Sequence, residues 1–208
     1  MEHVIRAVRA DEWSLVKELR LSALRDPVAP MAFLETYAQS AAHSDEFWRD
    51  RALSASEAGG GEVRQFVAVA PDGRWDGSVT VLIERPDGDE GEGENADRDR
   101  DADGDGDSGG GAVPFGAPAG LHQAHVVGVF VRPEARGAGL AEELFRAGTD
   151  WAWSLGEPRI ERVRLYVHED NARAAAFYRR IGFAPTGQSV PVPSDPSARE
   201  IEYAVGRP

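Results

Sequence analysis

The stretch that decides the fold of this chain runs from His125 to Ala141 and reads HVVGVFVRPEARGAGLA. After the histidine, its first part is continuously apolar, which predicts a buried strand. Pro133 ends that strand, and Gly137 and Gly139 precede an amphipathic helix. Unpaired N–H groups at a helix N-terminus attract anions, and glycine lets a bulky phosphate approach the backbone. The stretch therefore predicts strand, turn and helix, with either a phosphate site or a plain tight connection at the turn.

A dinucleotide site is the less favoured form of such a phosphate site. The Gly-x-Gly-x-x-Gly pattern needs a third glycine, and Glu142 stands at that position.

Around this stretch, the apolar periodicity predicts a mixed α/β (α+β) sheet with helices on both faces. The expected strands are His3–Arg9, Val63–Ala70, Gly77–Glu84, His122–Val131, Arg162–His168 and Arg199–Val205. The expected helices run from a cap at Asp11 to about Arg25, over Phe33–Ser40, from a cap at Ser44 or Asp45 to before Gly59, over Gly137–Leu155 and over Asn171–Ile181.

An acidic segment from residue 86 to about 118 interrupts this pattern. Residues 87–108 hold eleven acidic residues and two arginines, which accounts for −9 of the chain's net charge of −13. Such a composition cannot bury enough apolar surface to offset its ordering entropy. We expect a disordered insert at the tip of a hairpin, between the third and fourth strands of a single domain spanning residues 1–208.

Asp101, Asp103 and Asp105 in this insert resemble the first half of an EF-hand calcium loop. The twelfth position, which requires a glutamate, is Ala112, and no helices are expected beside the loop. We therefore expect no specific metal site.

The composition excludes several classes of function. The 208 residues include no cysteine, which excludes disulfides, thiolate metal sites and a cysteine nucleophile. No apolar run reaches the roughly 20 residues that span a bilayer, and the charged N-terminus does not fit a signal peptide. The net charge argues against a basic nucleic-acid-binding face. We expect a cytoplasmic protein without nucleic-acid or membrane partners.

The glycine turn carries a resemblance to a known family. Arg136, Gly139 and Ala141, with Val131 and Pro133 upstream, resemble the Arg/Gln-x-x-Gly-x-Gly/Ala motif of the GCN5-related N-acetyltransferase (GNAT) family.

The resemblance implies acetyl-CoA as co-substrate. The loop that would hold the pyrophosphate of coenzyme A comprises Arg136, Gly137, Ala138, Gly139, Leu140 and Ala141. A splayed strand would pair its backbone near Val129 and Val131 with the pantetheine arm. Gly128 either marks a bulge that produces the splay or is a tolerated small residue.

A second segment strengthens the resemblance. Asn171, Ala174, Tyr178 and Phe183 resemble the family's Asn-x-x-Ala-x-x-x-Tyr-x-x-x-Gly-Phe element. The resemblance implies that Asn171 contacts the cofactor and that Tyr178 is the general acid for the departing thiolate. From the residues alone, the favoured interpretations are a helix N-cap for Asn171 and a half-buried packing residue for Tyr178.

The general base and the acceptor pocket are less well defined. His125 is the best candidate for the base, because an unperturbed imidazole suits that role at neutral pH, although a structural histidine at the start of a strand fits as well. Glu35 and Tyr37 are expected to line the acceptor pocket, with a solvated surface as the alternative for Glu35. His168 and Glu169 are weaker candidates.

The predicted function is transfer of an acetyl group from acetyl-CoA to a primary amine of a small molecule or a protein N-terminus. The alternatives are a longer acyl donor and a non-catalytic acyl-CoA-binding sensor. The resemblance also allows a homodimer.

Overall fold

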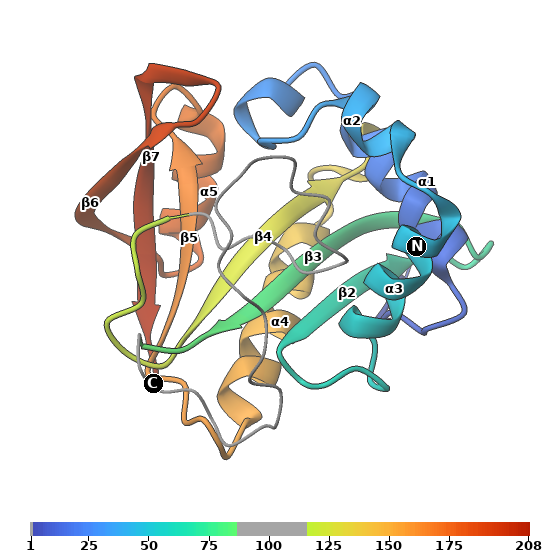
Figure 1. The fold of residues 1–208 in the computed structure, drawn as a ribbon, viewed down its shortest axis with the longest axis horizontal. Helices are drawn as coiled ribbons and strands as arrows, with labels where there is room; N and C mark the ends of the chain where they lie inside the picture. Colours follow the sequence, from blue (N-terminus) through green and yellow to red (C-terminus); the bar gives the residue numbers. More distant parts are fainter. Residues whose placement is uncertain (1, 87–115) are drawn as a thin grey trace, which may run out of the picture.

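A seven-stranded sheet organises the computed structural model, which describes residues 2–86 and 116–208 (Figure 1). The strand order is β1-β2-β3-β4-β5-β7-β6. Within this described part, β4 and β5 run parallel and every other neighbouring pair is antiparallel. The strands are β1 (Val4–Ala7), β2 (Val63–Val69), β3 (Trp75–Glu84), β4 (Gln123–Val131), β5 (Arg162–His168), β6 (Ala184–Val192) and β7 (Asp195–Gly206).

Helices cover both faces of this sheet, which confirms the predicted fold class. The helices are α1 (Trp13–Ala23), α2 (Tyr37–Ala42), α3 (Asp45–Ala55), α4 (Leu140–Ser154) and α5 (Ala172–Arg180), with short 3₁₀ turns at Ala29–Met31 and Pro133–Ala135. On one face, α1 and α3 pack on β2 around the fully buried Trp48. On the other face, α4 and α5 pack around Phe145 and Phe183. Burial of each such side chain stabilises the fold by about 1.5–3 kcal/mol.

Local side-chain chemistry sets where the first helices begin. The helix α1 starts after Glu12, so the predicted cap at Asp11 is wrong. The Glu12 carboxylate accepts hydrogen bonds from Arg6, at 2.6 and 2.8 Å, and from the Arg9 N–H. The predicted cap at Ser44 is confirmed, because its hydroxyl accepts the Phe47 N–H.

The predicted helix over Phe33–Ser40 instead runs over Tyr37–Ala42. Thr36 and Gln39 form a reciprocal capping box at its start, a motif that fixes a helix N-terminus.

The C-terminal tail contains one strand that the sequence pattern did not predict. The edge strand β6 includes Pro185, Gly187 and Pro191, residues that normally argue against a strand. It pairs with β7 alone, and prolines are tolerated at a sheet edge. The strand β7 is accordingly longer than the predicted Arg199–Val205.

The acidic insert joins β3 to β4, which are antiparallel neighbours, so its position between the third and fourth strands is as expected. Residues 87–115, and with them the calcium-like stretch from Asp101 to Ala112, lie outside the described residues. Beyond the insert, the Ala117 N–H donates to the Tyr166 hydroxyl at 3.0 Å, and Arg164 donates to the Ala117 carbonyl at 2.7 Å.

None of the helices in the described ranges has the length and apolar character needed to cross a lipid bilayer.

Candidate active site

The parallel strands β4 and β5 separate along their length (Figure 1). Their pairing covers Gln123, Ala124 and His125 of β4, opposite residues 162–164 of β5, and stops there. The rest of β4 keeps its pairing with β3 on its other side. Residues 126–131 therefore present one edge of their backbone to the space between the separated strands.

Gly128 lies at a bulge in β4. Its φ is +62°, and the register between β3 and β4 shifts between Ser78 and Thr80 opposite it. Because a left-handed residue in a strand favours glycine, the interpretation of Gly128 as a bulge residue is confirmed.

The glycine turn lies directly before α4. Gly137 and Gly139 have φ values of +88° and +83°, and Gly139 is the helix N-cap. The helix therefore begins at Leu140, three residues later than predicted, because two left-handed residues cannot be part of it.

The first N–H groups after this turn are available to a ligand. Among the described residues, none accepts a hydrogen bond from the backbone N–H groups of residues 137–141. A Cβ built on Gly137 or Gly139 would meet nothing within 4 Å. The turn thus presents open space and unpaired donors at a helix N-terminus, the arrangement that binds anions.

The Arg136 side chain is directed into the protein rather than into this space. Its Nε donates to the Val131 carbonyl at 2.9 Å, and its guanidinium pairs with the buried Asp26. Arg136 therefore ties the turn to the end of β4. The Val131 carbonyl, predicted to face the pantetheine arm, is occupied by this bond.

Asn171 caps α5. Its Oδ1 accepts the Ala174 N–H at 3.1 Å, so the capping interpretation is confirmed. A cofactor contact through its amide nitrogen stays a prediction.

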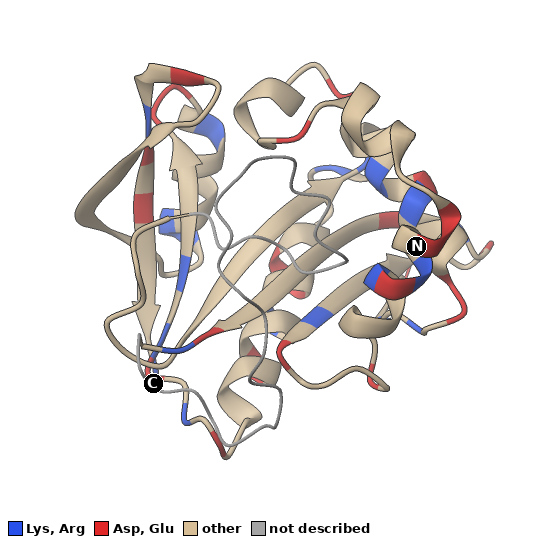
Figure 2. Ribbon diagram, viewed as in Figure 1, with Lys and Arg blue, Asp and Glu red and all other residues tan. Residues whose placement is uncertain are grey.

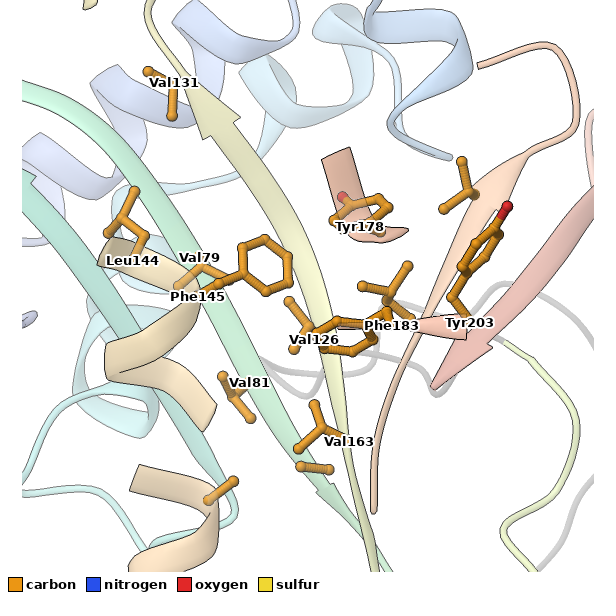
Figure 3. Close-up of a cluster of buried hydrophobic side chains, with 14 of the residues drawn as sticks. Val79, Val81, Val126, Val131, Leu144, Phe145, Val163, Tyr178, Phe183 and Tyr203 are labelled. Atoms are coloured by element: carbon orange, nitrogen blue, oxygen red, sulfur yellow. The ribbon is translucent and has the colours of Figure 1, made fainter. Parts of the chain in front are cut away.

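Tyr178 projects from α5 toward the gap between β4 and β5 (Figure 3). Its ring packs against Phe145 and Phe183 at centroid distances of 5.4 and 6.3 Å, and the residue is 8% exposed. Its hydroxyl has no hydrogen-bond partner among the described residues, but it is not fully enclosed. Burial, and secondarily the charge of Glu200, raises the pKa of the Tyr178 phenol well above its usual value. The phenol is therefore protonated at neutral pH, as a proton donor must be.

His125 lies in a buried polar cluster on the opposite face of the sheet from α5. The residue is 1% exposed, and its Nδ1 lies 2.9 Å from Glu84 Oε1. Its ring contacts the Tyr166 ring edge at a centroid distance of 5.5 Å. These contacts support a structural role, and its role as general base stays a prediction.

Arg164 is the centre of this cluster. It is 2% exposed and lies between two carboxylates, with Glu84 Oε2 2.8 Å from its Nε and Glu202 Oε2 3.0 Å from its Nη1. The contact with Glu84 is an ion pair without an aligned hydrogen bond, because Nε has no bond of good geometry. Burial disfavours ionisation of Glu84, but its hydrogen bond with His125 and its ion pair with Arg164 outweigh burial and lower the pKa of Glu84. The cluster joins β3, β4, β5 and β7 at the point where β4 and β5 begin to separate.

Of the two predicted acceptor residues, Glu35 lies on the connection between α1 and α2, and Tyr37 is the first residue of α2. Glu35 pairs with Arg20 at 3.0 Å and with His43 at 3.1 Å. The Tyr37 hydroxyl accepts a hydrogen bond from Arg25 at 2.5 Å. Both side chains thus have partners within the chain, and their contact with an acceptor stays a prediction.

Glu200 on β7 is a site residue that the sequence did not single out. Acidic residues mark β7 in Figure 2. Glu200 is 9% exposed, its carboxylate has no hydrogen bond or ion pair among the described residues, and its oxygens are not fully enclosed. Burial raises the pKa of Glu200 to about 7. Glu200 belongs to no sequence motif. It lies near the gap between β4 and β5 only because β7 pairs with β5 in the fold.

Within the described ranges, no group of three or more His, Cys, Asp or Glu residues has the arrangement of a metal site.

Comparison with known proteins agrees with this geometry. The chain matches the model of the acetyltransferase (GNAT) family over residues 106–183. A mycothiol acetyltransferase of Saccharomonospora viridis is 44% identical over 68 residues, which cover 33% of this chain and 20% of that protein. The chain therefore matches only about a fifth of the length of this curated relative.

Solved structures share the fold over almost the whole chain. The ribosomal-protein-S5-alanine acetyltransferase of Vibrio fischeri has a TM-score of 0.67 at 16% identity, covering 99% of this chain and 93% of that one. Arabidopsis thaliana NAA60, solved in complex with acetyl-CoA, has a TM-score of 0.60 at 16% identity, covering 99% and 98% of the two chains. At such identities the likeness concerns the fold.

The splayed parallel pair, the glycine turn and α4 all lie within the residues that match this family model. Residues 106–183 match the GNAT acetyltransferase family model, and the whole chain shares the fold of solved acetyltransferases.

Proposed function

We propose that this protein transfers an acetyl group from acetyl-CoA to a primary amine of a small molecule or a protein N-terminus. One observation carries the proposal: the open backbone edge of β4 leads directly to the unpaired N–H groups before α4. An extended pantetheine arm fits the first feature and a pyrophosphate fits the second.

The cofactor would lie along these two features. Val129 and the N–H of Val131 would bind the pantetheine arm, and residues 137–141 the pyrophosphate. Arg136 would act by holding the turn in place, and Asn171 through its amide nitrogen. The bound acetyl-CoA of the Arabidopsis thaliana structure supports this co-substrate, and the proposal includes no metal.

The chemistry is attack of a neutral amine on the thioester carbonyl. An alkylammonium has a pKa near 10, so the acceptor must lose a proton before it attacks. The thiolate leaving group needs a proton, and Tyr178, protonated at neutral pH and directed toward the splay, is the proposed donor. His125 is the base predicted from the sequence, and Glu35 and Tyr37 remain predicted acceptor contacts.

Two alternatives follow from the same site. A longer acyl chain could replace acetyl, or the domain could bind acyl-CoA without turning it over. The name of the curated relatives does not decide the acceptor, because the match covers 20% of that protein. The cytoplasmic location, the homodimer and the absence of nucleic-acid and membrane partners stay predictions.

A thiol-release assay with acetyl-CoA and a panel of primary amines tests the proposal. We expect release above the rate without amine for at least one acceptor, and an acetylated product by mass spectrometry. Butyryl-CoA and longer thioesters in parallel identify the acyl preference. Tight binding of acetyl-CoA with no amine-dependent release would contradict the proposal in favour of the sensor.

A further inference from the structure

Glu200 is a largely buried carboxylate that has no partner among the described residues, and its oxygens are not fully enclosed. It is 9% exposed, and neither an ion pair nor a hydrogen bond to it is found in the described part of the chain. Buried carboxylates are normally paired. The neighbouring Glu202 shows the contrast, because Arg164, Tyr166 and Thr186 all donate to it.

Glu200 lies on the sheet at the open end of the gap between β4 and β5. Its cross-strand partner is His168, at the C-terminal end of β5. The pairing of β5 with β4 lies at the other end of β5. Glu200 shares a face of β7 with Glu202, and hence the face of β5 that carries Arg164 and Tyr166. This is the face opposite α5.

Glu200 is close enough to Tyr178 for its charge to act on the phenol. That charge is the second cause, after burial, of the raised pKa of Tyr178. Glu200 lies on the face of β7 opposite α5, and Tyr178 projects from α5 toward the gap between β4 and β5 (Figure 3). A thioester carbonyl held between the separated strands would have a proton acceptor on one side and a proton donor on the other.

The other charged groups around Glu200 have partners of their own. His168 Nδ1 accepts the Asp170 N–H at 3.2 Å, and the Arg199 guanidinium binds Ser189. Neither is paired with the Glu200 carboxylate, so its charge is left for a cation from outside the chain. A primary ammonium is such a cation.

We propose that Glu200 binds the acceptor ammonium and takes its proton, which makes it the general base of the transfer. This assignment rests on the proposed acetyltransferase function and specifies its acceptor as a cationic amine. Burial raises the pKa of Glu200 to about 7, which suits a base at neutral pH. His125, by contrast, is 1% exposed and bonded to Glu84.

The proton balance of the step is complete. The Glu200 carboxylate takes one proton from R–NH₃⁺, and the neutral amine attacks the thioester carbonyl carbon. The C–N bond forms, the C–S bond breaks, and the thiolate takes the Tyr178 proton. The nitrogen loses its second proton to the Tyr178 phenolate through water, and Glu200 releases its proton to solvent. One amide, one thiol and one proton result.

The test uses the best amine from the panel and measures kcat/KM between about pH 6 and 9. Wild type should rise to an inflection near pH 7 and then level off, because ionised Glu200 acts on the ammonium form. In Glu200→Gln the reaction needs free amine, so kcat/KM should rise about tenfold per pH unit without that inflection. At pH 7.5 we expect a loss of roughly 10²-fold or more.

Three controls make the test specific. Glu161→Gln makes the same change on an exposed residue before β5 and should keep the wild-type profile. Glu200→Asp keeps a carboxylate and should retain the inflection at a reduced rate. Acetyl-CoA affinity of Glu200→Gln should stay within a few-fold of wild type.

The outcomes separate the two proposals. A wild-type profile in Glu200→Gln overturns the assignment and leaves the acetyltransferase standing. Loss of the inflection in His125→Asn but not in Glu200→Gln assigns the base to His125. A wild type that acetylates no amine overturns the proposed function and this assignment with it.

Discussion

The Tyr178 ring packs among aromatic rings, and its hydroxyl has no partner among the described residues. Removing the phenol oxygen therefore costs the fold no hydrogen bond among these residues. Tyr178→Phe should therefore leave the fold and the acetyl-CoA affinity nearly unchanged. Turnover should fall by roughly 10²–10⁴-fold, the usual contribution of a positioned general acid. Steady-state kinetics and calorimetry check this, and full activity in the variant would refute the proton-donor role.

The raised pKa of Glu200 also predicts how the stability of the protein depends on pH. Its pKa rises from 4.5 in the unfolded chain to about 7 in the fold, so between these pH values the folded state binds more protons than the unfolded state. The stability associated with the protonated group is present below pH 4.5 and is lost as pH rises through 7. The variant Glu200→Gln has no carboxylate to ionise. It should therefore be more stable than wild type at pH 8 by on the order of 3 kcal/mol, and not at pH 4.

Denaturant unfolding of wild type and Glu200→Gln at the two pH values measures this difference. Glu161→Gln, on an exposed side chain, should show none. An equal stability of wild type and Glu200→Gln at pH 8 would mean that the carboxylate has a partner in solution.

At the scale of elements, the turn before α4 determines cofactor binding. Gly139→Glu would place a Cβ and a carboxylate beside the unpaired N–H groups. We expect acetyl-CoA affinity to fall below detection by calorimetry. Gly187 in β6 has nearly the same φ, +87° against +83°, and equally open surroundings. Gly187→Glu thus carries the same backbone strain of about 1–2 kcal/mol and should bind acetyl-CoA like wild type.

A loss of affinity in both variants would show that strain, and not the blocked turn, is responsible. Unchanged affinity in Gly139→Glu would remove the turn from the cofactor site.

Most elements were predictable from the sequence because their signals are local. The strand β5 has its predicted bounds, and Ser44 and Asn171 cap helices as their positions indicated. The misses have non-local causes. The prolines of β6 argue against a strand in the sequence, and the strand forms because it pairs with β7. Glu12, rather than Asp11, directly precedes α1, and its carboxylate accepts hydrogen bonds from Arg6 and the Arg9 N–H.

The candidate site divides in the same way. The glycine turn and Tyr178 belong to motifs that the chain carries contiguously. Glu200 acquires its environment from His168 on another strand and from the gap beside β5, and no sequence spacing encodes that. The contacts of Glu84 with His125 and with Arg164 likewise join residues that are far apart along the chain.

At the scale of the whole molecule, the acidic insert interrupts an otherwise continuous β3–β4 hairpin. Deleting residues 87–111 leaves Ala117, which bonds Tyr166 and Arg164, in place. We expect the shortened chain to keep its cofactor affinity and turnover, and to melt within about 4 °C of wild type, the equivalent of about 1 kcal/mol. A larger fall in the melting temperature would show that the insert packs on the domain.

The central claim is that acetyl-CoA binds along the open edge of β4 and at the turn before α4. Hydrogen–deuterium exchange with and without acetyl-CoA tests it across the whole chain. Amides of residues 126–131 and 137–141 that lack a partner in the free protein should exchange more slowly with the cofactor. The β1–β2 pair and the edge strand β6, which lie away from the splay, should exchange unchanged. Slower exchange only in β1, β2 and β6, or no slowing of exchange in residues 126–141, would contradict the account.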